Sequence, residues 1–123
     1  MSSVNPVSHS ADCLFCKIIN LEIPASIVYE DERLVAFNDI NPQAPTHVLL
    51  VPKAHIATLN DLSAGDDAIV GELVRRAAAI AKERGFSAGG FRTVFNTNLE
   101  AGQTVFHIHL HLLGGRSFHW PPG

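Results

Sequence analysis

Residues 104–115 read Thr-Val-Phe-His-Ile-His-Leu-His-Leu-Leu-Gly-Gly, so three histidines alternate with apolar residues. Strict alternation is typical of a β-strand, because successive side chains point to opposite faces. We therefore expect a strand over residues 105–113, with its even-numbered apolar residues on a buried face. On the opposite face His107, His109 and His111 then form a row.

A single histidine in a strand is most often a half-buried core residue with satisfied ring nitrogens. Three at this spacing favour another interpretation, because histidine is a poor strand former and each imidazole needs polar partners. One metal ion bound by all three is excluded, since the outer pair lies about 13 Å apart and metal–nitrogen bonds measure about 2.1 Å. At most two neighbours share an ion, so the row divides its roles. The remaining interpretation is imidazole chemistry, with a nucleophile or acid–base group beside histidines that set its tautomer.

The rest of the chain adds four strands and two helices. Helical spacing predicts a short helix over residues 14–21, ended before Pro24, and a long helix that follows a capping box at Ser63 and stops at Gly85. Strand-like runs cover residues 26–30, 34–38, 46–51 and 91–96. Hairpin connections and the lack of regular strand–helix alternation predict an α+β fold with a roughly five-stranded antiparallel sheet.

Length and composition indicate one domain. The chain has 123 residues, a net charge of −3 and two cysteines, so it has neither a basic surface for nucleic acid nor a disulfide framework. Residues 1–11 are polar and contain no apolar run, so we expect a flexible leader rather than a signal or membrane segment. The expected organisation is a leader over residues 1–11 and a domain over residues 12–123, in a cytoplasmic protein with no membrane partner.

The histidine row resembles the signature of the histidine triad (HIT) superfamily, His-φ-His-φ-His-φ-φ, where φ is apolar. Several flanking segments are similar to its Hint branch, the histidine triad nucleotide-binding proteins. They are residues 37–47, 51–53, 101–103 and 114–123. The resemblance implies a HIT-like fold, an antiparallel sheet with one long and one short helix, paired as a two-fold homodimer.

The resemblance also implies catalytic roles. His109 corresponds to the family nucleophile, and His47 and His111 to neighbours that hydrogen-bond around it and the phosphate. A histidine at the third position of the triad, where nucleotide-transferring relatives have glutamine, implies hydrolysis. Thr104 stands where many Hint proteins have a serine that passes a proton to the leaving group, and threonine keeps the hydroxyl but restricts its rotamer.

A nucleotide site follows from the same resemblance. The backbone amides of Gly102, Gln103 and Thr104, with Asn96, are the implied phosphate donors, although glycine and asparagine in a loop are also ordinary turn residues. Asp39 is implied to hold the ribose hydroxyls, against the alternative of a turn-forming aspartate before Pro42. The implied apolar slot for the base, which the sequence does not distinguish from core, consists of Leu14, Phe15, Ile18, Phe37, Ile40 and Leu49.

Cys13 and Cys16 differ from the animal-type Hint pattern and resemble bacterial-type relatives that hold zinc. Two thiolates at this spacing, with His55 and His107, make a Cys₂His₂ set for one tetrahedral ion. Such a closed site is structural and would fix the first helix to the sheet. A redox pair and two reduced, inert thiols are the alternatives.

The function implied is hydrolysis of purine nucleoside phosphoramidates, which are AMP- or GMP-type conjugates, through a covalent nucleotidyl-histidine. No cofactor is needed for this chemistry, and zinc is the expected structural metal. The alternatives are hydrolysis of aminoacyl-adenylates or dinucleoside polyphosphates, a non-catalytic nucleotide-binding module that regulates a partner, and a metal-centred hydrolase.

Overall fold

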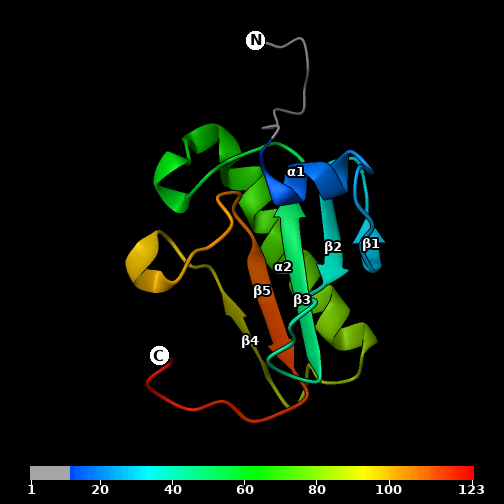
Figure 1. The fold of residues 1–123 in the computed structure, drawn as a ribbon. Coiled ribbons are helices and arrows are strands. Elements are labelled where there is room, and N and C mark those ends of the chain that lie inside the picture. Colours follow the sequence, from blue (N-terminus) through cyan, green and yellow to red (C-terminus); the bar gives the residue numbers. More distant parts are fainter. Residues whose placement is uncertain (1–11) are drawn as a thin grey trace.

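A computed structural model describes residues 12–123, so the expected leader over residues 1–11 lies outside the described residues. Five strands form one antiparallel sheet in the order β1-β2-β3-β5-β4 (Figure 1). The strands are β1 (Ile27–Glu30), β2 (Leu34–Asn38), β3 (Thr46–Pro52), β4 (Phe91–Val94) and β5 (Leu110–Gly114). The helices are α1 (Leu14–Ile19) and α2 (Asp67–Glu83), with 3₁₀ turns η1 (Leu59–Asp61), η2 (Ala64–Asp66) and η3 (Leu99–Ala101). The α+β prediction with one long and one short helix is confirmed.

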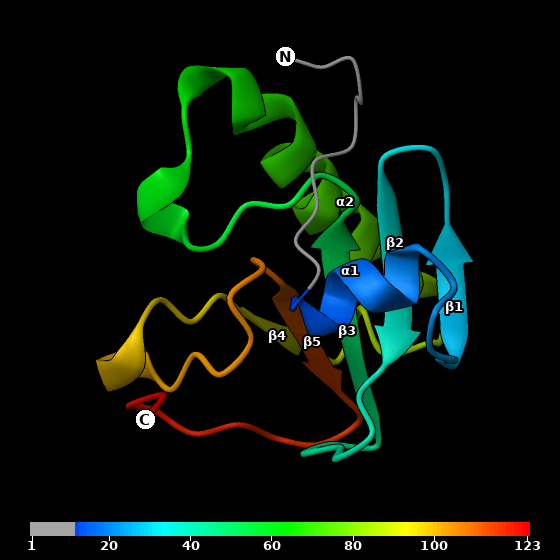
Figure 2. The same cartoon turned by 45° about the horizontal axis from the view of Figure 1, so that its top comes forward.

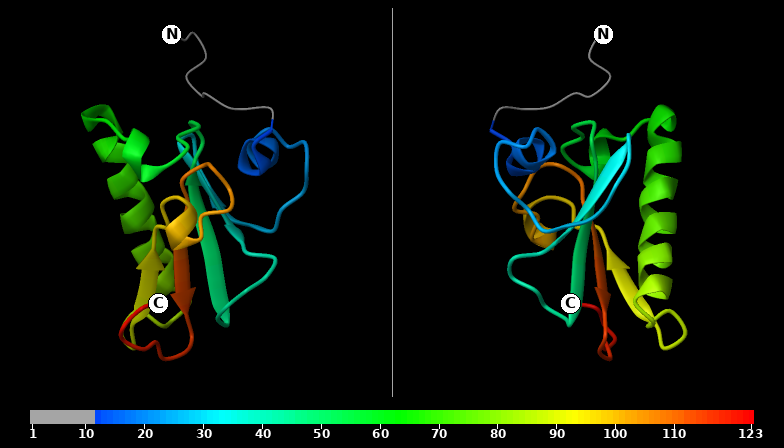
Figure 3. Two further views of the ribbon diagram at one scale, coloured as in Figure 1. Left: turned by 60° about the vertical axis from the view of Figure 1, so that its left-hand side comes forward. Right: turned by 90° about the vertical axis from the view of Figure 1, so that its right-hand side faces the viewer.

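The two helices cover opposite faces of the sheet, as the side views in Figure 3 show. Even-numbered strand residues such as Leu50 and Leu112, both fully buried, pack with Leu73 of α2 in the main core. Odd-numbered residues such as Phe37 and Leu49 pack with α1 in a second core. The period of two along each strand therefore separates a purely apolar face from the face that carries the histidines.

Helix α2 has the amphipathic pattern expected of it and buries Ile69, Leu73, Ala77, Ile80 and Ala81. The predicted capping box is present: the amide and hydroxyl of Ser63 donate to Asp66 Oδ2, and the box opens η2, which leads directly into α2. The helix ends before Gly85, whose φ of +86° is a left-handed conformation that glycine adopts without strain.

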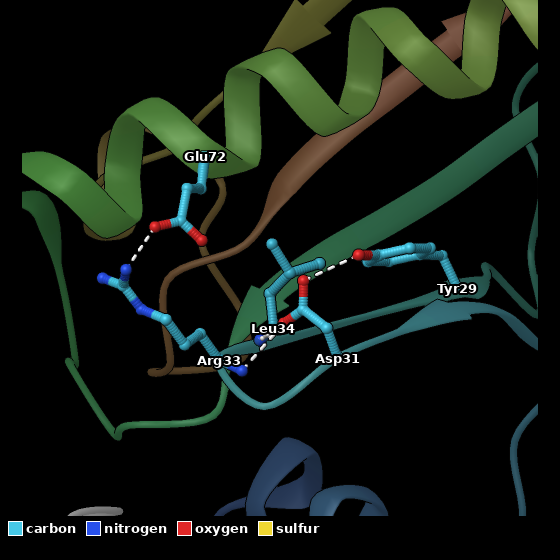
Figure 4. A network of polar contacts seen from close by, with 5 residues as sticks. All are labelled: Tyr29, Asp31, Arg33, Leu34 and Glu72. Carbon is cyan, nitrogen blue, oxygen red and sulfur yellow. Dashed lines mark hydrogen bonds and ion pairs between the residues drawn. The ribbon is translucent and has the colours of Figure 1, made fainter.

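The turn between β1 and β2 is fixed by Asp31 and attached to α2 (Figure 4). Asp31 Oδ1 accepts from the amides of Arg33 and Leu34 at 2.8 and 3.0 Å, and Oδ2 accepts from the Tyr29 hydroxyl at 2.7 Å. The Arg33 guanidinium forms an ion pair with Glu72 of α2. This hairpin is the edge of the sheet, and its second strand carries Phe37 toward the histidine face.

The prediction of one strand over residues 105–113 is wrong at its start, because β5 begins at Leu110. Leu50 and Leu110 are the last pair of the β3–β5 ladder. Extending it would align Ile108 with Pro52, which has no amide hydrogen to donate. The Ile108 amide instead donates to the Ile56 carbonyl at 2.7 Å. His107 thus lies in a bend and His109 in an irregular stretch just before the strand, and of the three histidines His111 alone belongs to it.

None of the helices within residues 12–123 is both long and apolar enough to cross a membrane.

Candidate active site

A cavity of about 470 Å³ lies between α1 and the histidine face of the sheet. Figure 2 shows α1 crossing that face. Ten predicted site residues line the cavity: Leu14, Phe15, Ile18, Phe37, Asp39, Ile40, Leu49, Thr104, His109 and His111. The structure thus brings the predicted base slot, ribose ligand and nucleophile to one space.

Six further residues line the cavity and were not predicted: Ile23, Pro24, Ala25, Ser26, Asn38 and Val105. Asn38 and Val105 are sequence neighbours of predicted site residues, so they could have been included in the predicted site on that ground. Residues 23–26 form the connection from α1 to β1, and nothing in their composition distinguishes them from an ordinary loop.

Four predicted residues do not line the cavity. The Gly102 amide donates to Leu99 O at 3.0 Å and the Gln103 amide to Asn98 O at 3.1 Å, so the turn around η3 uses both predicted phosphate donors. Gly102 closes this turn with a φ of +83°. Asn96 lies half-buried just beyond β4. His47 is hydrogen-bonded to His111, which itself lines the cavity. Thr104 is the predicted phosphate-loop residue that reaches the cavity.

The side chain of Gln103 has a role that the sequence did not indicate. It is 5% exposed, and its Oε1 accepts from the Asn98 amide at 2.8 Å. Its Nε2 donates to Ala57 O at 2.8 Å and to Val105 O at 3.1 Å. Gln103 therefore joins the loop before the histidines to the segment after β3, and fixes the path of residues 103–105 along the cavity.

The ring of His109 presents a lone pair to the cavity. Its Nδ1 lies 2.8 Å from the carbonyl oxygen of His107, and because a carbonyl only accepts, Nδ1 carries the proton. Nε2 is then unprotonated in the neutral ring. Burial lowers the pKa of His109, which is 9% exposed, and Phe15 packs edge-on at 5.0 Å. His109 is thus held in one orientation, and the lower pKa favours the neutral ring, the state that the predicted nucleophile requires.

His47 and His111 have the opposite tautomer. The Gln43 amide donates to His47 Nδ1 at 3.0 Å, so the proton of a neutral His47 is on Nε2. That nitrogen donates to His111 Nδ1 at 2.9 Å and lies 3.4 Å from Asp39 Oδ2. His111 therefore carries its own proton on Nε2. Burial, aided by His109 and His47, lowers the pKa of His111 to about 4, so this ring is a neutral hydrogen-bond donor at the cavity.

The cavity has little charge. Among residues 12–123 its lining includes Asp39 but no lysine or arginine. Asp39 is partly committed, since its Oδ1 accepts from the Asn41 amide at 2.8 Å. A bound phosphate would therefore be held by neutral donors such as His111 rather than by an ion pair.

The four predicted metal ligands meet beside the predicted catalytic histidines. Cys13 Sγ and Cys16 Sγ lie 3.3 and 3.6 Å from His107 Nδ1, and His55 Nδ1 lies 3.2 Å from it and 3.4 Å from Cys16 Sγ. Zinc bonds of about 2.1 Å to nitrogen and about 2.3 Å to sulfur place tetrahedral ligand atoms about 3.3–3.8 Å apart. The spacing of this group, which we call the metal cluster, therefore fits one zinc ion.

His107 is also oriented for a metal. Its Nε2 lies 2.7 Å from the Pro52 carbonyl oxygen, so Nε2 carries the proton and the Nδ1 lone pair faces the two sulfur atoms. The ring is completely buried, and burial lowers its pKa to about 4, which keeps it neutral. The donor set and the tautomer both suit a structural ion.

Asp39, His47 and His111 form a second group whose ligand atoms lie within 4.8 Å of one another. Its hydrogen bonds do not suit a metal. His47 Nδ1 accepts from an amide, so Nε2, the atom nearest Asp39 and His111, carries a proton. Coordination would require this proton to leave or the amide bond to break. The five histidines thus divide into the metal cluster, which contains His55 and His107, and a group of His47, His109 and His111, which we call the catalytic cluster after its predicted role.

Comparisons with known proteins agree with this geometry. The family model described as HIT domain matches residues 20–118. An uncharacterized HIT-like protein of Synechococcus elongatus is 53% identical over 114 residues, which cover 93% of this chain and 99% of that protein. The purine nucleoside phosphoramidase of Escherichia coli K12 is 50% identical over 105 residues, 85% of this chain and 88% of that protein.

Solved structures have the same fold. The crystal structure of a HIT family hydrolase from Legionella pneumophila superposes with a TM-score of 0.89 at 54% identity and covers 91% of this chain and 100% of that one. A histidine triad protein from Clostridium difficile gives a TM-score of 0.87 at 46% identity, over 90% of this chain and 96% of that one.

Proposed function

This chain belongs to the HIT domain family, and from that premise we propose that it hydrolyses purine nucleoside 5′-phosphoramidates through a nucleotidyl group carried on His109. The observation that carries the proposal is the hydrogen bond from His109 Nδ1 to His107 O, which leaves the Nε2 lone pair at the cavity. The Escherichia coli relative is a purine nucleoside phosphoramidase, which supports the substrate class.

In the first step His109 Nε2 attacks the α-phosphorus, and the bond from phosphorus to the leaving nitrogen breaks. The leaving nitrogen takes the proton of the Thr104 hydroxyl, at the cavity edge, and departs as an amine, while that hydroxyl regains a proton from solvent. The proton on His109 Nδ1 remains hydrogen-bonded to the His107 carbonyl oxygen and orients the ring throughout. In the second step water attacks phosphorus and releases one proton to solvent, the bond to Nε2 breaks, and AMP or GMP leaves the neutral ring.

The other residues of the site bind and orient the nucleotide. His111 Nε2–H donates to a phosphate oxygen, and its tautomer is maintained by the relay from the Gln43 amide through His47. A neutral His111 is suited to this task because it can donate this hydrogen bond without first taking up a proton. The Asp39 carboxylate accepts from the ribose hydroxyls, and the base lies against Phe15 and Phe37, which pack edge to face at 5.4 Å.

The low charge of the cavity favours an amine over a polyphosphate leaving group. A dinucleoside polyphosphate would bring several negative charges to a space whose lining, within the described residues, has no lysine or arginine and one carboxylate. An amine adds no negative charge. Aminoacyl-adenylates remain the nearer alternative, because their leaving group is also small.

The proposal includes a zinc ion in the metal cluster, held by Cys13, Cys16, His55 and His107. When bound, zinc supplies a closed cross-link between α1 and the sheet. No step of the reaction uses it. A homodimer and a cytoplasmic location are also part of the proposal and rest on the family resemblance.

The test is intact-protein mass spectrometry after brief mixing with adenosine 5′-phosphoramidate and acid quenching. We expect a mass gain of one adenylyl group in the wild type and none in His109→Ala, together with release of AMP by the wild type. Nucleotide binding without adduct or product would favour the binding-module alternative. Product without adduct would require a second quench at lower temperature, and its continued absence would contradict the covalent step.

A further inference from the structure

A second cavity of about 380 Å³ adjoins the first and is unused by the proposed reaction. The two cavities share Leu14, Thr104 and Val105 in their linings. His109 and His111 line only the first cavity, whereas Asp12 and Phe106 line only the second. Thr104, the residue placed next to the leaving nitrogen, thus stands at the boundary between them.

The geometry of displacement connects the second cavity with the leaving group. In an in-line reaction the departing nitrogen lies on the far side of phosphorus from His109 Nε2, away from the histidines. A chain attached to that nitrogen and passing Thr104 enters the second cavity, which contains neither catalytic histidine. The first cavity is already assigned to the nucleoside. A third cavity of about 350 Å³ also adjoins the first, but Thr104 does not line it, so the second cavity is the space beside the leaving nitrogen.

The lining of the second cavity has a definite chemistry. Its lining includes Cys13 and His55 of the metal cluster. Among the described residues it has one carboxylate, that of the exposed Asp12, and no lysine or arginine. Phe106 is 48% exposed, which is unusual for a phenylalanine beside a buried histidine, and with Val105 it gives an apolar wall. A cationic group is attracted by Asp12, an apolar body packs on Phe106, and an anionic group is repelled.

We propose that this second cavity is a leaving-group subsite, in which Asp12 and Phe106 select amines that carry a second, positively charged group on an apolar body. The proposal rests on the proposed function for its link to catalysis. Asp12 contacts the leaving group rather than the reacting atoms, so its effect is on specificity. An exposed ion pair contributes about 0.2–1 kcal/mol, which corresponds to a preference of about 1.4- to 5-fold.

The first arm of the test measures AMP release from three adenosine 5′-phosphoramidates that differ at the end of a three-carbon amine chain. The amines are propylamine, 1,3-diaminopropane and β-alanine, which end in a methyl, an ammonium and a carboxylate group. We expect kcat/KM to fall in the order ammonium, methyl, carboxylate. Asp12→Asn is expected to bring the ammonium-to-methyl ratio to about 1, whereas Glu100→Gln, which removes a nearby carboxylate outside both cavities, keeps the wild-type ratio.

A companion variant tests the apolar wall. Phe106→Ala is expected to lower kcat/KM for the phenethylamine phosphoramidate relative to the propylamine compound, while its ammonium-to-methyl ratio stays as in the wild type. Equal losses for both amines would mean that Phe106 does not contact the leaving group.

The second arm measures equilibrium binding of two uncleavable ligands, 5′-O-(N-propylsulfamoyl)adenosine and its N-(3-aminopropyl) analogue. This arm separates the subsite from the reaction. A binding preference for the ammonium ligand that Asp12→Asn abolishes supports the subsite even if no phosphoramidate is hydrolysed, a result that would overturn the proposed function alone. Hydrolysis and binding with the same preferences in Asp12→Asn and wild type would overturn the subsite and leave the proposed function standing.

Discussion

The metal cluster and the catalytic cluster use neighbouring histidines of one row, yet the backbone holds their rings in different states. His107 donates a hydrogen bond from Nε2–H to the Pro52 carbonyl, and its Nδ1 lone pair faces two cysteines. His109 donates a hydrogen bond from Nδ1–H to the His107 carbonyl, which leaves the lone pair on Nε2, at the cavity. The proposed roles of His107 as metal ligand and His109 as nucleophile thus depend on which ring nitrogen donates to a backbone carbonyl.

His47 shows the converse. A backbone amide, from Gln43, occupies its Nδ1, so the ring must donate through Nε2 and has no lone pair for a metal or for phosphorus. Residue type is the same in all three cases, and burial keeps the rings neutral by lowering their pKa values. The comparison teaches that a carbonyl partner leaves the other ring nitrogen with a lone pair, as the proposed ligand and nucleophile require, whereas an amide partner makes that nitrogen a donor.

The largest expected effect comes from removing the nucleophile. His109→Ala is expected to lower kcat for AMP release by at least about 10⁴-fold, since loss of a nucleophile removes the reaction path itself. Bound zinc is expected to be unchanged, because His109 is outside the metal cluster. Turnover assays and elemental analysis on the same preparation check both statements. Activity within tenfold of the wild type would show that another residue is the nucleophile.

A smaller effect is expected on stability when one sulfur ligand is replaced. Cys13 is also the N-cap of α1, with its Sγ accepting from the Cys16 amide, and Cys13→Ser keeps that acceptor while weakening zinc binding. A ligand at about 1,000 times its Kd contributes about 4 kcal/mol. We therefore expect the Tm of the zinc-loaded protein to fall by roughly 10–20 °C.

Metal-free wild type is the control for this variant. Calorimetry of both proteins in a chelator is expected to give Tm values within about 5 °C of each other, because the cap is retained. A wild-type Tm that does not depend on zinc would contradict a structural metal.

The smallest effect concerns pH. An unfolded histidine takes up a proton near pH 6.5, whereas folded His111, half-buried and with its pKa lowered to about 4, stays neutral. Acid therefore favours the unfolded state, and stability that is present above about pH 6.5 is lost as the pH falls toward 4. His111→Gln removes this proton uptake and keeps an acceptor for His47.

Urea denaturation at pH 7.5 and pH 5 measures the difference. The free energy of unfolding of the wild type is expected to fall more than that of His111→Gln, by about 1 kcal/mol, because water reaches part of the ring and reduces the full titration effect. Equal pH dependence in the two proteins would indicate that His111 is already protonated in the folded state.

Much of this arrangement could be predicted from sequence because it follows from periodicity. Alternation placed Leu110 and Leu112 in the core, and helical spacing with the Ser63 box gave α2. The strand's early end was not predictable from the histidine segment alone, since it depends on Pro52, which lies opposite in the fold and lacks an amide hydrogen.

The site was predicted where chemistry depends on side-chain type and missed where it depends on backbone. Asp39, Thr104 and His109 reach the cavity as expected. The amides of Gly102 and Gln103 do not, because their use is decided by a local turn. The tautomers of His107 and His47 are set by the backbone carbonyl of Pro52 and the backbone amide of Gln43. Nearly every residue has both groups, so they leave no sequence pattern.

The most direct test of the division of the row is the tautomer of each histidine, read from long-range ¹H–¹⁵N spectra of the zinc-loaded protein at pH 7.5 and assigned with single histidine variants. We predict a neutral His109 with its proton on Nδ1, and neutral His47 and His111 with their protons on Nε2, while His107 carries its proton on Nε2 and binds metal through Nδ1. A His109 that is protonated on Nε2, or charged, would have no lone pair for phosphorus and would contradict the account.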